Sequence, residues 1–157
     1  MAKKRPIRVL FLCTGNSARS ILAEALLDHL GAGQFEAESA GSHPTGRVHP
    51  LALAQLELMR LPVAGLRSKA WDEFAGPHAT PFDVIVTVCD DAASETCPAW
   101  PGMAQRLHWS IADPAAVTGT PAERQAAFQA TANALADRIR TLVETAVTAP
   151  AGGAGRG

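Results

Sequence analysis

The fold of this 157-residue chain is decided by residues 7–20, which read Ile7-Arg8-Val9-Leu10-Phe11-Leu12-Cys13-Thr14-Gly15-Asn16-Ser17-Ala18-Arg19-Ser20. An apolar run that is typical of a buried β-strand ends in Cys13, and a loop of small residues follows it. A helical pattern begins at Arg19. The backbone N–H groups of such a loop have no intrahelical partner and converge at the positive end of a helix dipole, so they can surround a tetrahedral oxyanion. Arg19 would add a planar, two-pronged donor to the same anion.

Cys13 would lie beneath that anion, where the positive field favours its thiolate form and makes it a nucleophile. A cysteine after an apolar strand is often only a small buried hydrophobe. Here the spacing to Arg19, the glycine at position 15 and the nearby hydroxyl groups favour the anion site. The predicted oxyanion site consists of Thr14, Gly15, Asn16, Ser17, Ala18, Arg19 and Ser20.

The composition is that of one globular domain, because 47% of the residues are hydrophobic and 18% are charged. The net charge is −1 and there is no basic stripe, so nucleic acid is not expected as a partner. No stretch is long enough to span a bilayer, and the apolar run after Lys3-Lys4-Arg5 is too short for a secretory signal. We expect a cytoplasmic monomer. The odd number of cysteines, three, favours catalytic or redox use over a structural disulfide framework.

Strand and helix patterns alternate along the chain, which predicts a single small doubly wound α/β domain. Right-handed crossovers favour a four-stranded parallel sheet of order 2-1-3-4, flanked by helices. We expect a flexible N-terminus (1–6), one domain (7–147) and a disordered tail (148–157). The expected strands are 7–12, 35–40, 82–88 and 105–109; the expected helices are 19–30, 50–61 and 121–147, with a short helix at 71–74.

This strand order places two cysteines at one edge of the sheet. Strands one and three become neighbours, and they end at Cys13 and Cys89. Cys89 could attack the sulfur of Cys13 once that sulfur carries the substrate atom, and Cys97 could then attack Cys89. Asp113, before Pro114, could protonate a leaving oxygen, although an Asp-Pro pair is also common in turns. Cys89 and Cys97 do not have the usual zinc spacing, and no metal site is predicted.

The chain resembles the arsenate reductases built on the low-molecular-weight protein tyrosine phosphatase fold. The likeness runs from about Ile7 to Val147. It is carried by residues 13–20, by Ala40-Gly41-Ser42, His49-Pro50, Val86-Thr87-Val88-Cys89-Asp90, Cys97-Pro98 and Asp113-Pro114.

This resemblance implies arsenate reduction and arsenic resistance, with Cys13 as nucleophile, Cys89 as resolving thiol and Cys97 as the third thiol of a relay. It also implies that Arg19 binds arsenate and Asp113 is the general acid, and that phosphate or sulfate competes. No tightly bound cofactor is implied; thioredoxin would be the reductant, with glutaredoxin and glutathione as the alternative. Some members hold a potassium ion. Asn16, Glu24 and Ser39 match that pattern, but no acidic fourth ligand is evident and Lys69 could supply the charge instead, so the ion is not predicted.

Three other functions remain open at this point. A phosphatase on the same scaffold would hydrolyse phosphomonoesters, but the chain contains no tyrosine and Asp113-Pro114 is followed by two alanines. Weak phosphatase activity is still expected, because arsenate and phosphate are nearly isosteric. A phosphocarrier of the sugar-transport type would not require Arg19 or the later thiols. An oxyanion-binding regulator would tolerate Cys13→Ser with binding intact.

Overall fold

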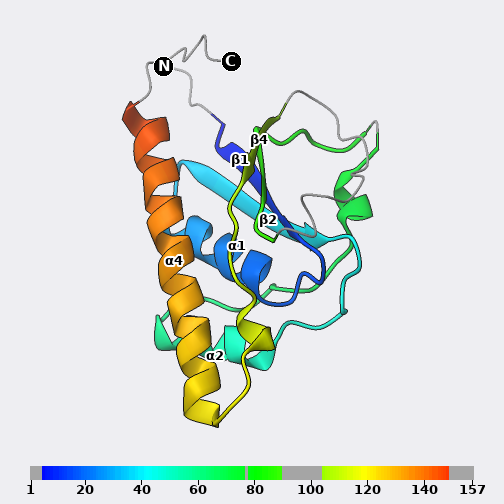
Figure 1. Ribbon diagram of the computed structural model, residues 1–157. Coiled ribbons are helices and arrows are strands. Elements are labelled where there is room, and N and C mark those ends of the chain that lie inside the picture. The colour runs from blue at the N-terminus through cyan, green and yellow to red at the C-terminus, as the bar shows by residue number, and fades with distance from the viewer. Residues whose placement is uncertain (1–4, 77, 90–103, 149–157) are drawn as a thin grey trace.

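The computed structural model describes residues 5–76, 78–89 and 104–148. Their core is a sheet of four parallel strands in the order β2-β1-β3-β4, as the sequence predicts (Figure 1). The strands are β1 (Ile7–Cys13), β2 (Phe35–Gly41), β3 (Val84–Thr87) and β4 (Gln105–His108).

Strand β1 lies in the centre, and its apolar residues alternate between the two faces of the sheet. Val9 and Phe11 join the larger core cluster with the helices, while Leu10 and Leu12 join a smaller cluster on the opposite face. All four are fully buried. A strand covered on both faces reads as a continuous apolar run, and this explains the composition of residues 7–13.

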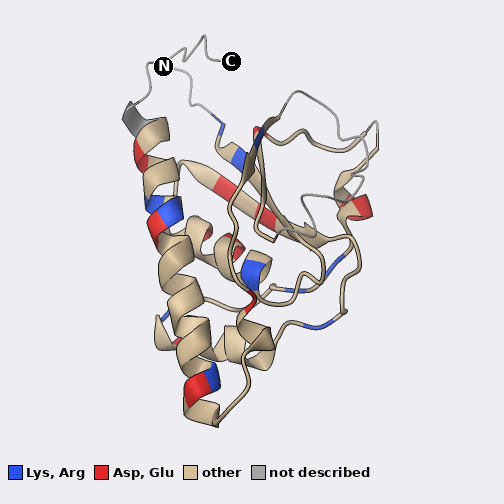
Figure 2. Cartoon of the chain, in the orientation of Figure 1, with Lys and Arg blue, Asp and Glu red and all other residues tan. Residues whose placement is uncertain are grey.

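Three helices cover the face of the larger cluster: α1 (Arg19–Leu30), α2 (Pro50–Leu58) and α4 (Pro121–Thr148). Helix α4 packs against both α1 and α2 and runs along the side of the domain (Figure 1). The 3-10 helix η1 (Trp71–Phe74) contributes Trp71 and Phe74 to the opposite face. Figure 2 shows basic and acidic residues interspersed along α4. Within the described part of the chain, no helix has the length and apolarity needed to cross a membrane.

Helix α2 ends three residues earlier than predicted. The sequence predicts a helix from Pro50 to Leu61, but Arg60 adopts a left-handed conformation with φ of 62° and stops it. The N–H of Leu61 donates to the carbonyl of Leu56, and the N–H of Arg60 donates to that of Glu57, which is the bonding pattern of a Schellman cap. Burial of Leu56 and Leu61 accompanies this cap, so packing overrides the poor left-handed preference of arginine.

Strands β3 and β4 are shorter than the predicted ranges 82–88 and 105–109. Their backbone bonding nevertheless continues beyond the ladder residues. The N–H of Val88 donates to Leu12 at 2.9 Å, and the N–H of Trp109 donates to Thr87 at 2.8 Å. These bonds hold the segments that follow both strands at the carboxyl edge of the sheet.

Candidate active site

The nucleophile loop (residues 13–20) connects β1 to α1 at the carboxyl edge of the sheet. Cys13 is the last residue of β1 and is 3% exposed. Its Sγ lies 2.9 Å from the Oγ of Ser20 in the first turn of α1. Asn16, between them, has a φ of 47°, a left-handed conformation that asparagine tolerates better than most residues. The predicted oxyanion residues therefore lie in one tight turn that starts at the sulfur.

Neighbouring segments hold the outer side of this loop through its carbonyl groups. The carbonyl of Thr14 accepts from the N–H of His43 at 2.9 Å, and that of Gly15 accepts from the N–H of Thr45 at 3.0 Å. The hydroxyl of Ser68 also donates to Gly15, at 3.1 Å. In a planar trans peptide the carbonyl and the following N–H point in opposite directions. The N–H groups of Gly15 and Asn16 are therefore turned toward the inner side of the loop, as an anion site requires.

A buried chain of hydrogen bonds fixes Asn16 in the loop. Its Nδ2 donates to the hydroxyls of Ser20 at 2.8 Å and Ser39 at 3.0 Å, and its Oδ1 accepts from the N–H of Lys69 at 2.8 Å. The two polar atoms of this amide, Nδ2 and Oδ1, are thus both bound, which is required of a side chain that is fully buried.

The chain continues from Ser39 to Glu24 of α1. The hydroxyl of Ser39 donates to Glu24 Oε1 at 2.6 Å, and Lys69 Nζ lies 3.8 Å from the same oxygen. Burial raises the pKa of Glu24 from 4.5 to about 7, although Ser39 and Lys69 both act to lower it. Glu24 and Lys69 thus form a buried ion pair that is linked to the nucleophile loop through Ser39 and Asn16.

Arg19 and Asp113 meet beside the loop. Arg19 Nη1 donates to the carbonyl of Ile111 at 2.9 Å, and Nη2 lies 3.7 Å from Asp113 Oδ2. The other carboxylate oxygen of Asp113 accepts from the N–H of Ala115 at 2.9 Å and caps the 3-10 helix η2 (Pro114–Ala116). Asp113 therefore forms the turn that is common for an Asp-Pro pair and also lies beside the nucleophile loop. Its side chain is 42% exposed and remains next to Arg19.

Cys89 follows β3 at the same edge of the sheet and is 3% exposed. Its Sγ lies 3.7 Å from the hydroxyl of Thr14, the residue next to Cys13. Neither Cys13 nor Cys89 forms a disulfide with another residue of the described ranges. The structure thus brings Cys89 to the nucleophile loop, while Cys97 lies outside the described residues.

Some contacts that shape this site leave no signal in the sequence. Ile111 contributes only a backbone carbonyl to Arg19, so its side chain gives no signal. His49 is the N-cap of α2, where its Nδ1 accepts from the N–H of Leu51, and its own N–H donates to the carbonyl of Ser17 in the nucleophile loop. Within the described ranges, no three His, Cys, Asp or Glu residues are grouped so as to hold a metal ion.

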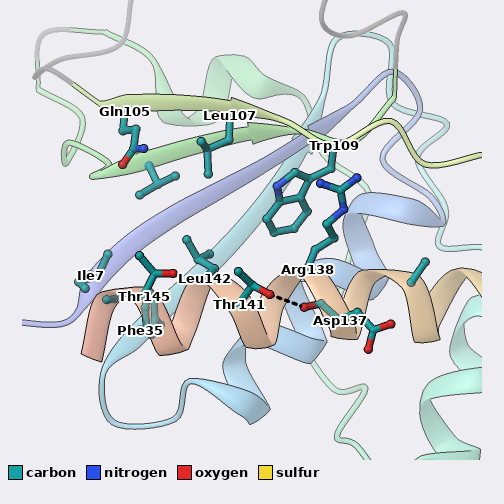
Figure 3. A pocket seen from close by; sticks show the side chains of 13 residues that line it. Ile7, Phe35, Gln105, Leu107, Trp109, Asp137, Arg138, Thr141, Leu142 and Thr145 are labelled. Carbon is teal, nitrogen blue, oxygen red and sulfur yellow. Dashed lines mark hydrogen bonds between the residues drawn. The ribbon is translucent and has the colours of Figure 1, made fainter. Parts of the chain in front are cut away.

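A separate cavity of about 870 Å³ lies between β4 and α4. It is lined by the first residues of the strands, including Ile7 and Gln105, and by Leu142 and Ala146 of α4 (Figure 3). Leu107 and Trp109 extend the lining along β4, but no residue of the nucleophile loop lines the cavity, and neither do Cys89 and Asp113. The cavity is therefore distinct from the nucleophile site.

The comparisons with known proteins agree with this geometry. The family model for low molecular weight phosphotyrosine protein phosphatase matches residues 8–150. An arsenate reductase of Halalkalibacterium halodurans is 34% identical over 137 residues, which are 87% of this chain and 95% of the relative. A solved arsenate reductase in its phosphate-binding state superposes with a TM-score of 0.72 at 25% identity, covering 88% of this chain and 98% of the other. A thioredoxin-dependent arsenate reductase of Corynebacterium glutamicum gives a TM-score of 0.66 at 26% identity, covering 92% of this chain and 63% of the other. The chain therefore belongs to the low molecular weight phosphotyrosine protein phosphatase family, as the resemblance predicted, and shares its fold with arsenate reductases.

Proposed function

We propose that this protein is an arsenate reductase that works through a relay of three thiols. The observation that carries the proposal is the position of Cys89, whose sulfur lies against Thr14 of the nucleophile loop. A hydrolase of this fold needs one cysteine, an arginine and an acid. A second thiol held at the same loop is what a reductase needs in addition.

In the first step, the Cys13 thiolate attacks the arsenic of arsenate bound by Arg19 and the loop N–H groups. An oxygen leaves as water, and Asp113 supplies a proton to it. The product is an arsenic(V) adduct on Cys13. Support for these roles comes from the 2.9 Å contact between Ser20 and the sulfur and from the position of Asp113 beside Arg19.

In the second step, the sulfur of Cys89 attacks the sulfur of Cys13. The Cys13–Cys89 disulfide forms, the sulfur–arsenic bond breaks, and its electron pair stays on arsenic, which leaves as arsenite. Cys97 then attacks Cys89, which frees Cys13 and forms a Cys89–Cys97 disulfide. An external dithiol, thioredoxin in our proposal, reduces that last disulfide. This chemistry requires a reducing compartment, so we place the protein in the cytoplasm.

Hydrolysis of phosphomonoesters is the second candidate, because the family model is that of a phosphatase. Water would then resolve a phosphocysteine on Cys13, and Cys89 would have no role. We expect this activity to be weak.

The two functions separate in one assay. NADPH consumption with thioredoxin, its reductase and arsenate is followed for wild type and for Cys13→Ser, Cys89→Ser and Cys97→Ser. The relay predicts no sustained NADPH consumption by any of the three variants, although Cys97→Ser should still complete a single turnover. The protein would instead be a phosphatase if it hydrolyses an aryl phosphate efficiently, if Cys89→Ser does so at the same rate, and if wild type consumes no NADPH in response to arsenate. If Cys97→Ser turns over normally with thioredoxin, the relay is wrong and a glutathione and glutaredoxin couple becomes the reductant to test.

A further inference from the structure

Two buried charged residues next to the nucleophile loop have no part in the proposed reaction. Glu24 is 8% exposed and Lys69 is 6% exposed. Lys69 Nζ lies 3.8 Å from Glu24 Oε1 and donates to the carbonyl of Arg67 at 3.3 Å. Burying two charges is costly, and removal of one partner leaves the other uncompensated. A buried pair of this kind, so close to the nucleophile loop, indicates a role in the site.

The hydrogen bonds that link this pair to Cys13 diverge from the Asn16 amide, and the direction of each one is fixed. An ionised Glu24 can only accept, so the hydroxyl of Ser39 donates to it, and the Ser39 oxygen is left to accept from Asn16 Nδ2.

The second N–H of the Asn16 amide donates to Ser20. Ser20 then has one hydrogen left, and the Cys13 sulfur lies 2.9 Å from its oxygen. The Asn16 amide cannot flip, because the N–H of Lys69 occupies its oxygen.

We propose that Lys69 is a positioning residue of the nucleophile loop, whose ammonium compensates the buried Glu24 carboxylate and thereby fixes the hydrogen-bond chain that ends in donation from Ser20 to the Cys13 sulfur. The proposal rests on the proposed function and deepens it by naming what holds the hydroxyl of Ser20 against the sulfur of its nucleophile. Residue 69 acts twice, with its side chain on Glu24 and its backbone N–H on Asn16. A neutral Glu24 could donate to Ser39 and compete with the bond from Asn16.

The same geometry decides whether a potassium ion fits. The resemblance associates such an ion with Asn16, Glu24 and Ser39. In this chain the ammonium of Lys69 already pairs with the carboxylate of Glu24, and a second cation at that oxygen would meet like charge in a buried place. The residues present do not fit the ion. An internal cation replaces it, and potassium should have no specific effect on the loop.

The test measures the reactivity of Cys13 without arsenate or any reductant, so it does not depend on the success of the turnover assays. In a Cys89→Ser/Cys97→Ser background Cys13 is the only thiol, and its rate of alkylation by iodoacetamide at pH 8, where Glu24 is ionised, reports the reactivity of its sulfur. We expect Lys69→Met to lower this rate about tenfold, the size of one hydrogen bond to a charged group. Arg67→Met is the matched control, because Arg67 lies two positions before Lys69 and its side chain forms an exposed ion pair with Glu73. Its rate should equal that of the background protein.

A double-mutant cycle shows whether Lys69 acts through Glu24. Glu24→Gln alone should lower the rate, and adding Lys69→Met to it should change nothing further. Effects of the two substitutions that multiply would overturn the proposal. If Lys69→Met alone does not fold by circular dichroism, the comparison of Glu24→Gln with the double variant still decides. A rise in alkylation rate or melting temperature of the background protein in KCl over NaCl at equal ionic strength would also overturn it.

Discussion

Gly41 lies where the end of β2 meets the nucleophile loop, and we predict that Gly41→Ala disables anion binding. Gly41 pairs with Cys13 in the sheet, and a β-carbon there would lie 2.8 Å from the carbonyl oxygen of Cys13. It would also lie 3.1 Å from the β-carbon of Asn16, and the carbonyl of Thr14 is closer still. The obstructing carbonyl atoms are backbone, so the loop itself must shift.

The cost follows from overpacking, which destabilises a well-packed site by about 1–3 kcal/mol. For a domain of this size, about 2–4 °C of melting temperature corresponds to 1 kcal/mol, so we expect a fall of about 2–12 °C. Arsenate or phosphate binds only the folded protein and raises its melting temperature. In the variant this rise should be lost, because the shifted Thr14 and Asn16 no longer aim the loop N–H groups at one point.

Differential scanning fluorimetry with and without arsenate measures both effects. Gly65→Ala is the matched control: Gly65 has a φ of 88° and nothing lies within 4 Å of an added β-carbon. It should lose about 1–2 kcal/mol through left-handed strain and keep the full response to arsenate. A Gly41→Ala protein with wild-type melting temperature and an intact arsenate response would refute this reasoning.

Three further predictions concern single side chains of the site. Ser20→Ala removes the contact with the Cys13 sulfur and should slow alkylation of Cys13 by about tenfold or more, measured with iodoacetamide; an unchanged rate would contradict the contact's role. Asp113→Asn keeps the shape but removes the acid, so arsenate turnover should fall by about 10²-fold with little change in melting temperature, and equal turnover would rule out Asp113 as proton donor. Burial raises the pKa of Glu24 from 4.5 to about 7. Ionisation of this carboxyl therefore does not affect the unfolding free energy below pH 4.5, and it lowers that free energy as the pH rises. The loss reaches about 3 kcal/mol at pH 7. Urea denaturation of wild type and Glu24→Gln across this pH range should show a flatter curve for the variant, and parallel curves would contradict the burial effect.

The sheet and the nucleophile loop could be predicted because their signals are local. The apolar run that ends at Cys13 and the helix that starts at Arg19 are contiguous in sequence, and crossover handedness then fixes the strand order. The predicted end of the first helix, at residue 30, is confirmed, and Gly31 follows it. It ends α1 at φ of −106°, outside the left-handed region, and a β-carbon there would lie 2.7 Å from the ring of Phe35.

The features that could not be predicted depend on packing between distant segments. Lys69 reaches Asn16 across 53 positions, and Ser68 reaches Gly15 across the same separation. No local pattern indicates that residues after α2 fold back onto the loop. The early end of α2 has a similar origin, since arginine is a poor left-handed residue and the conformation at Arg60 accompanies the burial of Leu56 and Leu61.

The central claim is that Cys89 resolves the arsenic adduct on Cys13. The most direct measurement mixes arsenate with the fully reduced Cys97→Ser protein without any external reductant, counts the arsenite released, and maps the disulfide by mass spectrometry. The account predicts one arsenite per chain and a Cys13–Cys89 disulfide. Arsenite release without that disulfide, or equal release from Cys89→Ser, would contradict it.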